Sequence, residues 1–78
     1  MHSDHDLDVT GLTCPMPLLK AKQKLNQIQP GETLHVMATD PGSMRDFASF
    51  IKLTSHELLE SREEEGVYHY LIRKGESR

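Results

Sequence analysis

The stretch that decides the fold is residues 6–17, Asp-Leu-Asp-Val-Thr-Gly-Leu-Thr-Cys-Pro-Met-Pro. Its first half alternates aspartate with Leu7 and Val9, as a half-buried strand does, and Gly11 then breaks the alternation. Its second half holds two closely spaced prolines, and proline is favoured in the first turn of a helix. We therefore expect a strand that turns directly into a helix, with Cys14 at the junction.

The predicted helix carries an apolar stripe at the 3.6-residue period of one helical face. The stripe consists of Leu18, Ala21, Leu25 and Ile28. Pro30-Gly31 is expected to end this helix. Lys20, Lys22 and Lys24 fall on the remaining surface, which predicts a basic outer face.

The remainder of the chain predicts one central strand, a second helix and a hairpin. Residues 33–39 are β-prone and apolar on both faces, as in a central strand. Ser43 and Asp46 resemble a capping box at the start of a helix whose buried stripe begins at Phe47. Residues 56–62 and 67–74 read as two strands around an acidic turn at 63–66.

This order of elements predicts an α/β (α+β) two-layer sandwich, β-α-β-α-β-β, with a four-stranded mixed sheet and two helices on one face. We expect residues 1–5 to be a flexible tail, residues 6–75 a single domain, and residues 76–78 a second tail.

Size and composition restrict the function. A chain of 78 residues buries only about 60% of the surface that its unfolded form exposes, so little apolar material is left for a deep substrate pocket. The 9 basic and 12 acidic residues give a net charge of −3, which argues against direct nucleic-acid binding. One cysteine excludes an intrachain disulfide and suits a reducing compartment. Without a secretory signal or an apolar run near 20 residues, we expect a soluble cytoplasmic protein with no membrane partner.

Cys14 is the predicted working residue. Pro15 and Pro17 lack N–H groups, which leaves those of Met16 and Leu18 free at the start of the helix. With Cys14 as the N-cap, its sulfur would accept the Met16 N–H and lie at the positive end of the helix dipole. Both effects lower a thiol pKa, so the sequence predicts an exposed, nucleophilic thiolate.

Other interpretations remain open from the residues alone. A lone cysteine is most often a small buried apolar residue, and the two prolines could simply punctuate the helix. No base stands beside Cys14 in the sequence, so a hydrolase would need the fold to bring a histidine to it. His2 and His5 with nearby aspartates could bind a metal weakly, but a polar tail accounts for them, and we expect neither metal nor cofactor. His35 and His69 are predicted on the sheet surface.

Several blocks together resemble the TusA (SirA-like) sulfur-carrier family and its Cys-Pro-x-Pro motif. The blocks are residues 8–17, 30–34, 40–41, 45–47 and 70–75. The resemblance implies the same fold. It also implies that Cys14 accepts sulfane sulfur as a persulfide from a cysteine desulfurase and relays it to an acceptor protein. The chain would then be a sulfurtransferase-type carrier and not a multi-turnover enzyme.

The resemblance implies further details of the site. The sulfur would reach 2-thiouridine in tRNA, the molybdenum cofactor or a related product of sulfur trafficking. Asp40 and Arg45 fall where the family has residues of the partner-facing loop and second helix, although capping and surface solvation explain them equally. Met16 replaces the glutamate usual between the prolines, which removes a charge near the thiol and puts the tRNA destination in doubt.

A protein- or RNA-interaction module with a regulatory role is the alternative. Its basis is the row of Lys20, Lys22 and Lys24 on a two-layer α/β fold. No aromatic residue interleaves with these lysines, and the acidic turn at 63–65 opposes nucleic acid. The basic surface could equally receive an acidic partner protein.

Overall fold

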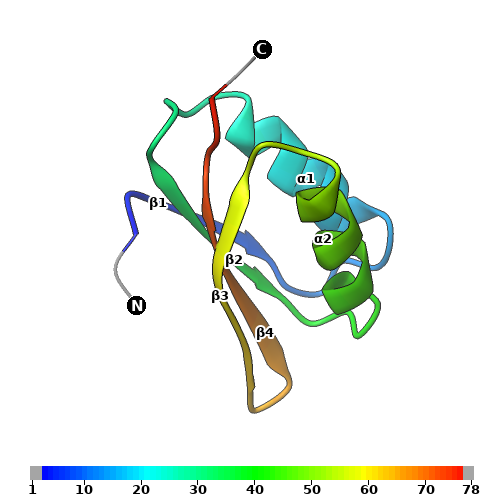
Figure 1. Ribbon diagram of the computed structural model, residues 1–78. Helices are drawn as coiled ribbons and strands as arrows, with labels where there is room; N and C mark the ends of the chain where they lie inside the picture. Colours follow the sequence, from blue (N-terminus) through cyan, green and yellow to red (C-terminus); the bar gives the residue numbers. More distant parts are fainter. Residues whose placement is uncertain (1–2, 77–78) are drawn as a thin grey trace.

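The computed structural model describes residues 3–76 of the chain. In chain order the elements are β1 His5–Val9, α1 Met16–Leu25, β2 Thr33–Ala38, α2 Ser43–Lys52, β3 Glu57–Glu64 and β4 Val67–Arg73. The strands form one sheet in the order β1-β2-β4-β3, and both helices lie on one face of it (Figure 1). The predicted two-layer sandwich is confirmed.

The sheet is mixed because of how its strands connect. β1 pairs parallel to β2 through the α1 crossover, whereas β4 pairs antiparallel to both β2 and β3. β2 therefore occupies the predicted central position. Its pairing aligns Val9 with Ala38, so the loops that follow β1 and β2 leave the same edge of the sheet. These two loops carry Cys14 and Asp40.

The core lies between the sheet and the two helices. Along β2, the side chains that face the helices are buried, at Leu34, Val36 and Ala38. Phe47 of α2 is 0% exposed and stacks on the ring of Tyr70 from β4, with ring centroids 4.5 Å apart. This aromatic pair joins α2 to the sheet.

Helix α1 is shorter than predicted at both ends. It begins at Met16 and ends at Leu25, well before the expected stop at Pro30-Gly31. Ile28 is still buried although it lies in the turn after the helix, because its side chain packs in the hydrophobic core. The Lys74 ammonium also donates to the Ile28 carbonyl, which joins this turn to the end of β4. The apolar period therefore extends past the last residue of the helix, and this is why the predicted helix was too long at its C-terminal end.

The predicted capping box at the start of α2 is wrong. The N-cap is Gly42, and Ser43 makes no capping bond. Ser43 is instead 1% exposed, and its hydroxyl lies 2.7 Å from the Tyr70 hydroxyl in the core. The Asp46 side chain does not reach back to the helix start either, because it contacts Cys14.

Tyr70→Phe is expected to lower the free energy of unfolding by about 1–3 kcal/mol, because it leaves the buried Ser43 hydroxyl without its partner. Urea unfolding measures this loss. The double variant Ser43→Ala/Tyr70→Phe removes both hydroxyls and should lose less than the sum of the two single variants. Strict additivity would show that this hydrogen bond does not couple α2 to β4.

The predicted domain boundaries need correction. His5 belongs to β1, and the Asp4 N–H donates to the Thr33 hydroxyl at 2.9 Å, so part of the predicted N-terminal tail is joined to the sheet. At the other end, the Glu76 carbonyl accepts a hydrogen bond from the Ser55 hydroxyl at 2.9 Å. The rest of both predicted tails, residues 1–2 and 77–78, lies outside the described residues.

The hairpin strands differ from their predicted ranges by one or two residues: β3 starts one residue later and ends two residues later, and β4 ends one residue earlier. β3 continues through Glu64, so the turn consists of Glu65 and Gly66 only. Both residues have positive φ, 52° and 81°, as the tight turns that match strand twist require. The hairpin extends past the helical layer (Figure 1).

Candidate functional site

Cys14 lies in the loop between β1 and α1, and its side chain is exposed. It is not the N-cap that the sequence predicted. Pro15 holds that position, and the Met16 N–H donates to the Thr13 carbonyl at 2.9 Å instead of to the Cys14 sulfur. Residues 13–16 form a turn that leads into the helix. The Thr13 carbonyl in this turn binds the Met16 N–H that was predicted to bind the Cys14 sulfur.

Two carboxylates hold Cys14 in place. Asp46, from the first turn of α2, accepts a hydrogen bond from the Cys14 Sγ at 2.9 Å. Asp40, from the loop between β2 and α2, accepts the Cys14 N–H at 2.9 Å. The side chain and the backbone of the cysteine are therefore both bound to the segment around the start of α2.

These carboxylates reverse the predicted electrostatics. The hydrogen bond to Asp46 raises the pKa of the Cys14 thiol, and partial desolvation and the negative charges of Asp46 and Asp40 raise it further. The predicted preference for the thiolate is therefore wrong. The predicted effect of the helix dipole rests on residues close in sequence, whereas the carboxylate with the largest effect on the thiol, that of Asp46, lies 32 residues away.

The other motif residues separate into exposed and buried positions. Pro15 is exposed, Pro17 is buried, and Leu18 is partly buried against the core. Met16, two residues after Cys14, is 40% exposed. Pro17 thus anchors one side of the loop, while Pro15 and Met16 form part of the exposed surface.

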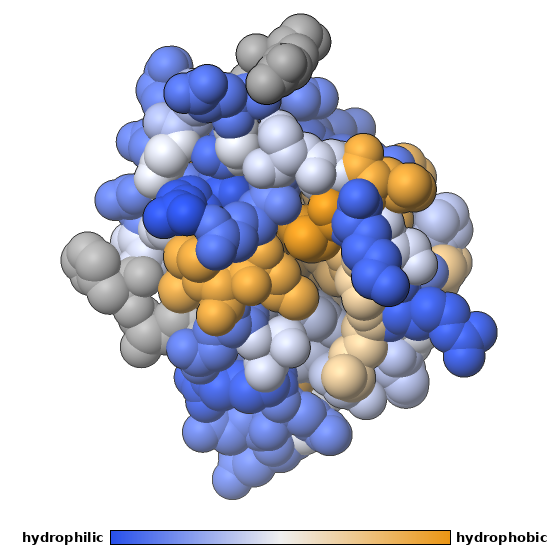
Figure 2. Space-filling view, viewed as in Figure 1, coloured by the Kyte–Doolittle hydropathy of each residue, from blue (hydrophilic) through white to orange (hydrophobic). Residues whose placement is uncertain are grey.

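Two further apolar side chains are exposed on the helices beside this loop. Leu19 of α1 is 42% exposed and Met44 of α2 is 52% exposed. Neither was predicted as a functional residue, although an apolar residue on the polar face of a predicted helix is the sequence signal for such an exposed contact. Figure 2 shows apolar residues as separate groups among hydrophilic ones on the face that it presents.

The residues predicted to contact partners lie on the two helices and the loop before α2, and they differ in how far they are exposed. Lys20, Arg45 and Lys22 are exposed, whereas Lys24 and Asp40 are partly buried. Lys22 also places its ammonium 5.3 Å from the centre of a ring of α2, that of Phe50. The three lysines therefore do not form one free basic row.

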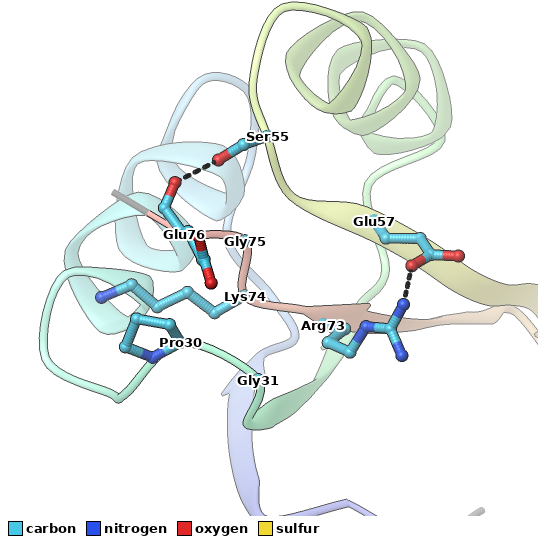
Figure 3. A pocket seen from close by; sticks show the side chains of 8 residues that line it. All are labelled: Pro30, Gly31, Ser55, Glu57, Arg73, Lys74, Gly75 and Glu76. Atoms are coloured by element: carbon cyan, nitrogen blue, oxygen red, sulfur yellow. Dashed lines mark hydrogen bonds and ion pairs between the residues drawn. The ribbon is translucent and has the colours of Figure 1, made fainter. Parts of the chain in front are cut away.

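A hollow lies at the other edge of the sheet from Cys14, where β2 begins and β4 ends (Figure 3). Its lining residues are Pro30, Gly31, Ser55, Glu57, Arg73, Lys74, Gly75 and Glu76. Glu57 and Arg73 form an ion pair across β3 and β4. Gly75 passes so close to the Ser55 carbonyl that a Cβ would collide with it. The two side chains of nucleophilic type at this hollow are already bound, the Ser55 hydroxyl to the Glu76 carbonyl and the Lys74 ammonium to the Ile28 carbonyl. The lining residues therefore serve to join β3, β4 and the loop before β2.

The sheet face without helices carries a row of hydrogen-bonded polar side chains that was not predicted from the sequence. His35 Nε2 lies 2.9 Å from His69 Nδ1, and His35 Nδ1 lies 3.2 Å from an Asp6 carboxylate oxygen. Both histidines are on the sheet surface, as predicted, but strand register makes them partners. Within residues 3–76, no three side chains of the metal-binding types gather as an ion would require.

We expect the protein to lose stability in mild acid. Burial, followed by neighbouring positive charges, lowers the pKa of His69 and of His56 below 6.5 in the folded state. The unfolded chain therefore binds these protons more readily, so the free energy of unfolding falls as the pH drops below 6.5. Around His69 the other groups are Arg62, His35 and Glu64.

Urea unfolding at about pH 7.5 and about pH 5.5 measures this effect, because carboxylates stay charged in this range. His69→Gln should make the pH dependence shallower. Equal stability of the wild-type protein at the two pH values would contradict the assignment.

Fold and site together define a class of protein: a small two-layer α/β domain that presents one exposed thiol on the loop before its first helix. No helix within the described part of the chain has the length and apolar character needed to cross a membrane. Comparison with known proteins identifies the family. The family model described as sulfurtransferase TusA matches residues 5–74, and the chain belongs to this family.

Individual relatives agree. A sulfur carrier protein TusA of Allochromatium vinosum is 55% identical over 71 residues, which cover 91% of this chain and 93% of the relative. A putative sulfur carrier protein of Neisseria meningitidis serogroup A is 48% identical over 66 residues, covering 85% and 89%. The crystal structure of a SirA-like protein from Desulfitobacterium hafniense has the same fold, with a TM-score of 0.79, 23% identity and coverage of 92% and 99%.

Proposed function

We propose that the protein is a sulfur carrier that accepts sulfane sulfur on Cys14 from a cysteine desulfurase and relays it to an acceptor protein in the cytoplasm. The observation that carries this proposal is the exposed thiol of the only cysteine, within the segment that matches the TusA family. The names of the relatives as sulfur carrier proteins support it.

The transfer needs no oxidant. The Cys14 sulfur attacks the outer sulfur of the donor's cysteine persulfide, a new S–S bond forms, and the donor's S–S bond breaks. The donor cysteine leaves as a thiolate and takes up the proton that Cys14 gives up, so one thiol and one persulfide simply exchange the sulfur atom. A second exchange of the same kind delivers the sulfur: a cysteine of the acceptor attacks the outer sulfur of the Cys14 persulfide, and Cys14 leaves as the thiolate.

An exposed loop suits this exchange better than a pocket. Two proteins must bring their sulfur atoms into contact, and a nucleophile enclosed in a cavity could not reach the partner. We propose that the donor and the acceptor dock over the loop, with Met16, Leu19 and Met44 as apolar contacts. Lys20 and Arg45 would attract acidic groups at the edge of this contact.

The proposed destination is 2-thiouridine in tRNA, the molybdenum cofactor or a related product of sulfur trafficking. Met16 adds apolar surface beside the thiol where the family's usual glutamate would add charge. This difference supports an acceptor protein whose contact surface near the loop is apolar.

The test is transfer from a desulfurase. The protein, a cysteine desulfurase and free cysteine are incubated, and the intact mass is recorded before and after treatment with a thiol reductant. We expect a gain of one sulfur atom that the reductant removes. A wild-type protein whose mass does not change, while the desulfurase still turns over cysteine, would refute the proposal.

A further inference from the structure

Asp46 is the group in closest contact with the Cys14 thiol, and the function proposed above gives it no role. Its carboxylate is 2.9 Å from Sγ, and its neighbour in the chain, Phe47, is fully buried. The first turn of α2 is therefore fixed against the core. Because Asp40 holds the Cys14 backbone at the same time, neither side of the sulfur–carboxylate contact is free to drift.

We propose that Asp46 is a positioning residue that acts differently on the empty and the loaded carrier. In the empty carrier it holds the thiol by accepting a hydrogen bond from it. In the loaded carrier it turns the sulfane sulfur of the persulfide outward. This inference rests on the proposed sulfur-carrier function.

In the empty carrier, the thiol is the donor and the ionised carboxylate can only accept. A carboxylate is a far weaker base than a thiolate, so the proton stays on sulfur and Asp46 does not act as a general base. The negative charges of Asp46 and Asp40 both oppose ionisation of the thiol. The empty carrier is thus kept in its less nucleophilic form and is protected from alkylation and oxidation.

In the loaded carrier, the hydrogen bond to Asp46 is lost. Cys14 Sγ is then bonded to a second sulfur and has no proton to donate. The second sulfur lies about 2.05 Å beyond Sγ, and the 2.9 Å between Sγ and the Asp46 oxygen leaves no room for it. A persulfide is more acidic than a thiol, so the outer sulfur is anionic and both carboxylates repel it. It therefore points away from α2, into solvent, where an acceptor can reach it.

The test compares alkylation of the two forms by iodoacetamide. The loaded form is made with inorganic polysulfide, so that no desulfurase is needed. We expect the empty Asp46→Asn protein to react roughly threefold or more faster than wild type at neutral pH, with its pH–rate profile moved to lower pH. The loaded form should change little, so the ratio of loaded to empty rates should fall.

Two further variants separate charge from structure. Glu76→Gln removes a carboxylate at the opposite edge of the sheet (Figure 3) and should leave the ratio unchanged. Asp46→Glu keeps the charge and should restore most of the wild-type profile. Circular dichroism spectra would test whether each variant is folded, and Asp46→Glu against wild type remains informative where Asp46→Asn does not fold.

An unchanged ratio in folded Asp46→Asn, or an equal fall in Glu76→Gln, would overturn the role of Asp46. This failure is distinct from failure of the proposed function. A protein that shows the expected ratios but gains no sulfur from a desulfurase refutes the carrier proposal alone. A protein that gains sulfur from the enzyme but shows an unchanged ratio refutes the Asp46 inference alone.

Discussion

Cys14→Ala is expected to abolish sulfur loading completely. No other cysteine is present, and neither histidine nor carboxylate side chains hold a sulfane sulfur through an S–S bond. The variant incubated with a desulfurase and cysteine should show no mass increase that a thiol reductant removes. Because the Cys14 side chain is exposed, the free energy of unfolding of the variant should differ from that of the wild-type protein by no more than about 0.5 kcal/mol.

Cys14→Ser is the matched control. Its hydroxyl can still donate to Asp46, so the loop keeps the contact that the thiol makes, yet the oxygen cannot carry sulfane sulfur. Both variants should therefore fail to load while remaining folded. A reducible gain of one sulfur atom on either variant would show that the sulfur is held elsewhere, and the assignment of Cys14 would be wrong.

The fold was predictable because its signals are local. The alternation at Leu7 and Val9, the apolar stripe of α1 and the breaks between elements each operate within a few residues. They suffice for the element order, and the order with its short connections leaves few ways to arrange four strands and two helices. The boundaries were less accurate, as at Ile28, where an apolar residue is buried from a turn.

The site was predictable only in part, because its decisive contact is not local. Cys14 was identifiable from its prolines, but the Asp46 carboxylate reaches it across 32 residues and only after α2 packs on the sheet. Ser43 was misread for the same reason, since its partner Tyr70 lies 27 residues away. Local rules assign a polar side chain to its own helix end and cannot detect a partner that tertiary packing supplies.

Phe47→Ala is expected to destabilise the protein more than Tyr70→Phe or any substitution of Cys14. Phe47 is fully buried and stacks on Tyr70, so truncation removes an aromatic side chain and leaves a cavity between α2 and the sheet. Comparable substitutions cost about 3–5 kcal/mol. A domain of this size is stabilised by only about 4–12 kcal/mol in total, so the loss is a large share of the whole.

Urea unfolding measures the loss, and Leu53→Ala is the control. Leu53 is the C-cap of the same helix but is 87% exposed, so its truncation should change the free energy of unfolding by no more than about 0.5 kcal/mol.

The two variants also differ in their expected effect on the thiol. The buried residues of α2 are Phe47 and the much smaller Ser43. Loss of the Phe47 ring therefore frees Asp46 to move away from Cys14, and alkylation of the thiol should become faster. Leu53→Ala should alkylate as wild type does. Equal stability of the two variants would contradict the claim that the Phe47–Tyr70 contact fixes α2, and with it the carboxylate at the thiol.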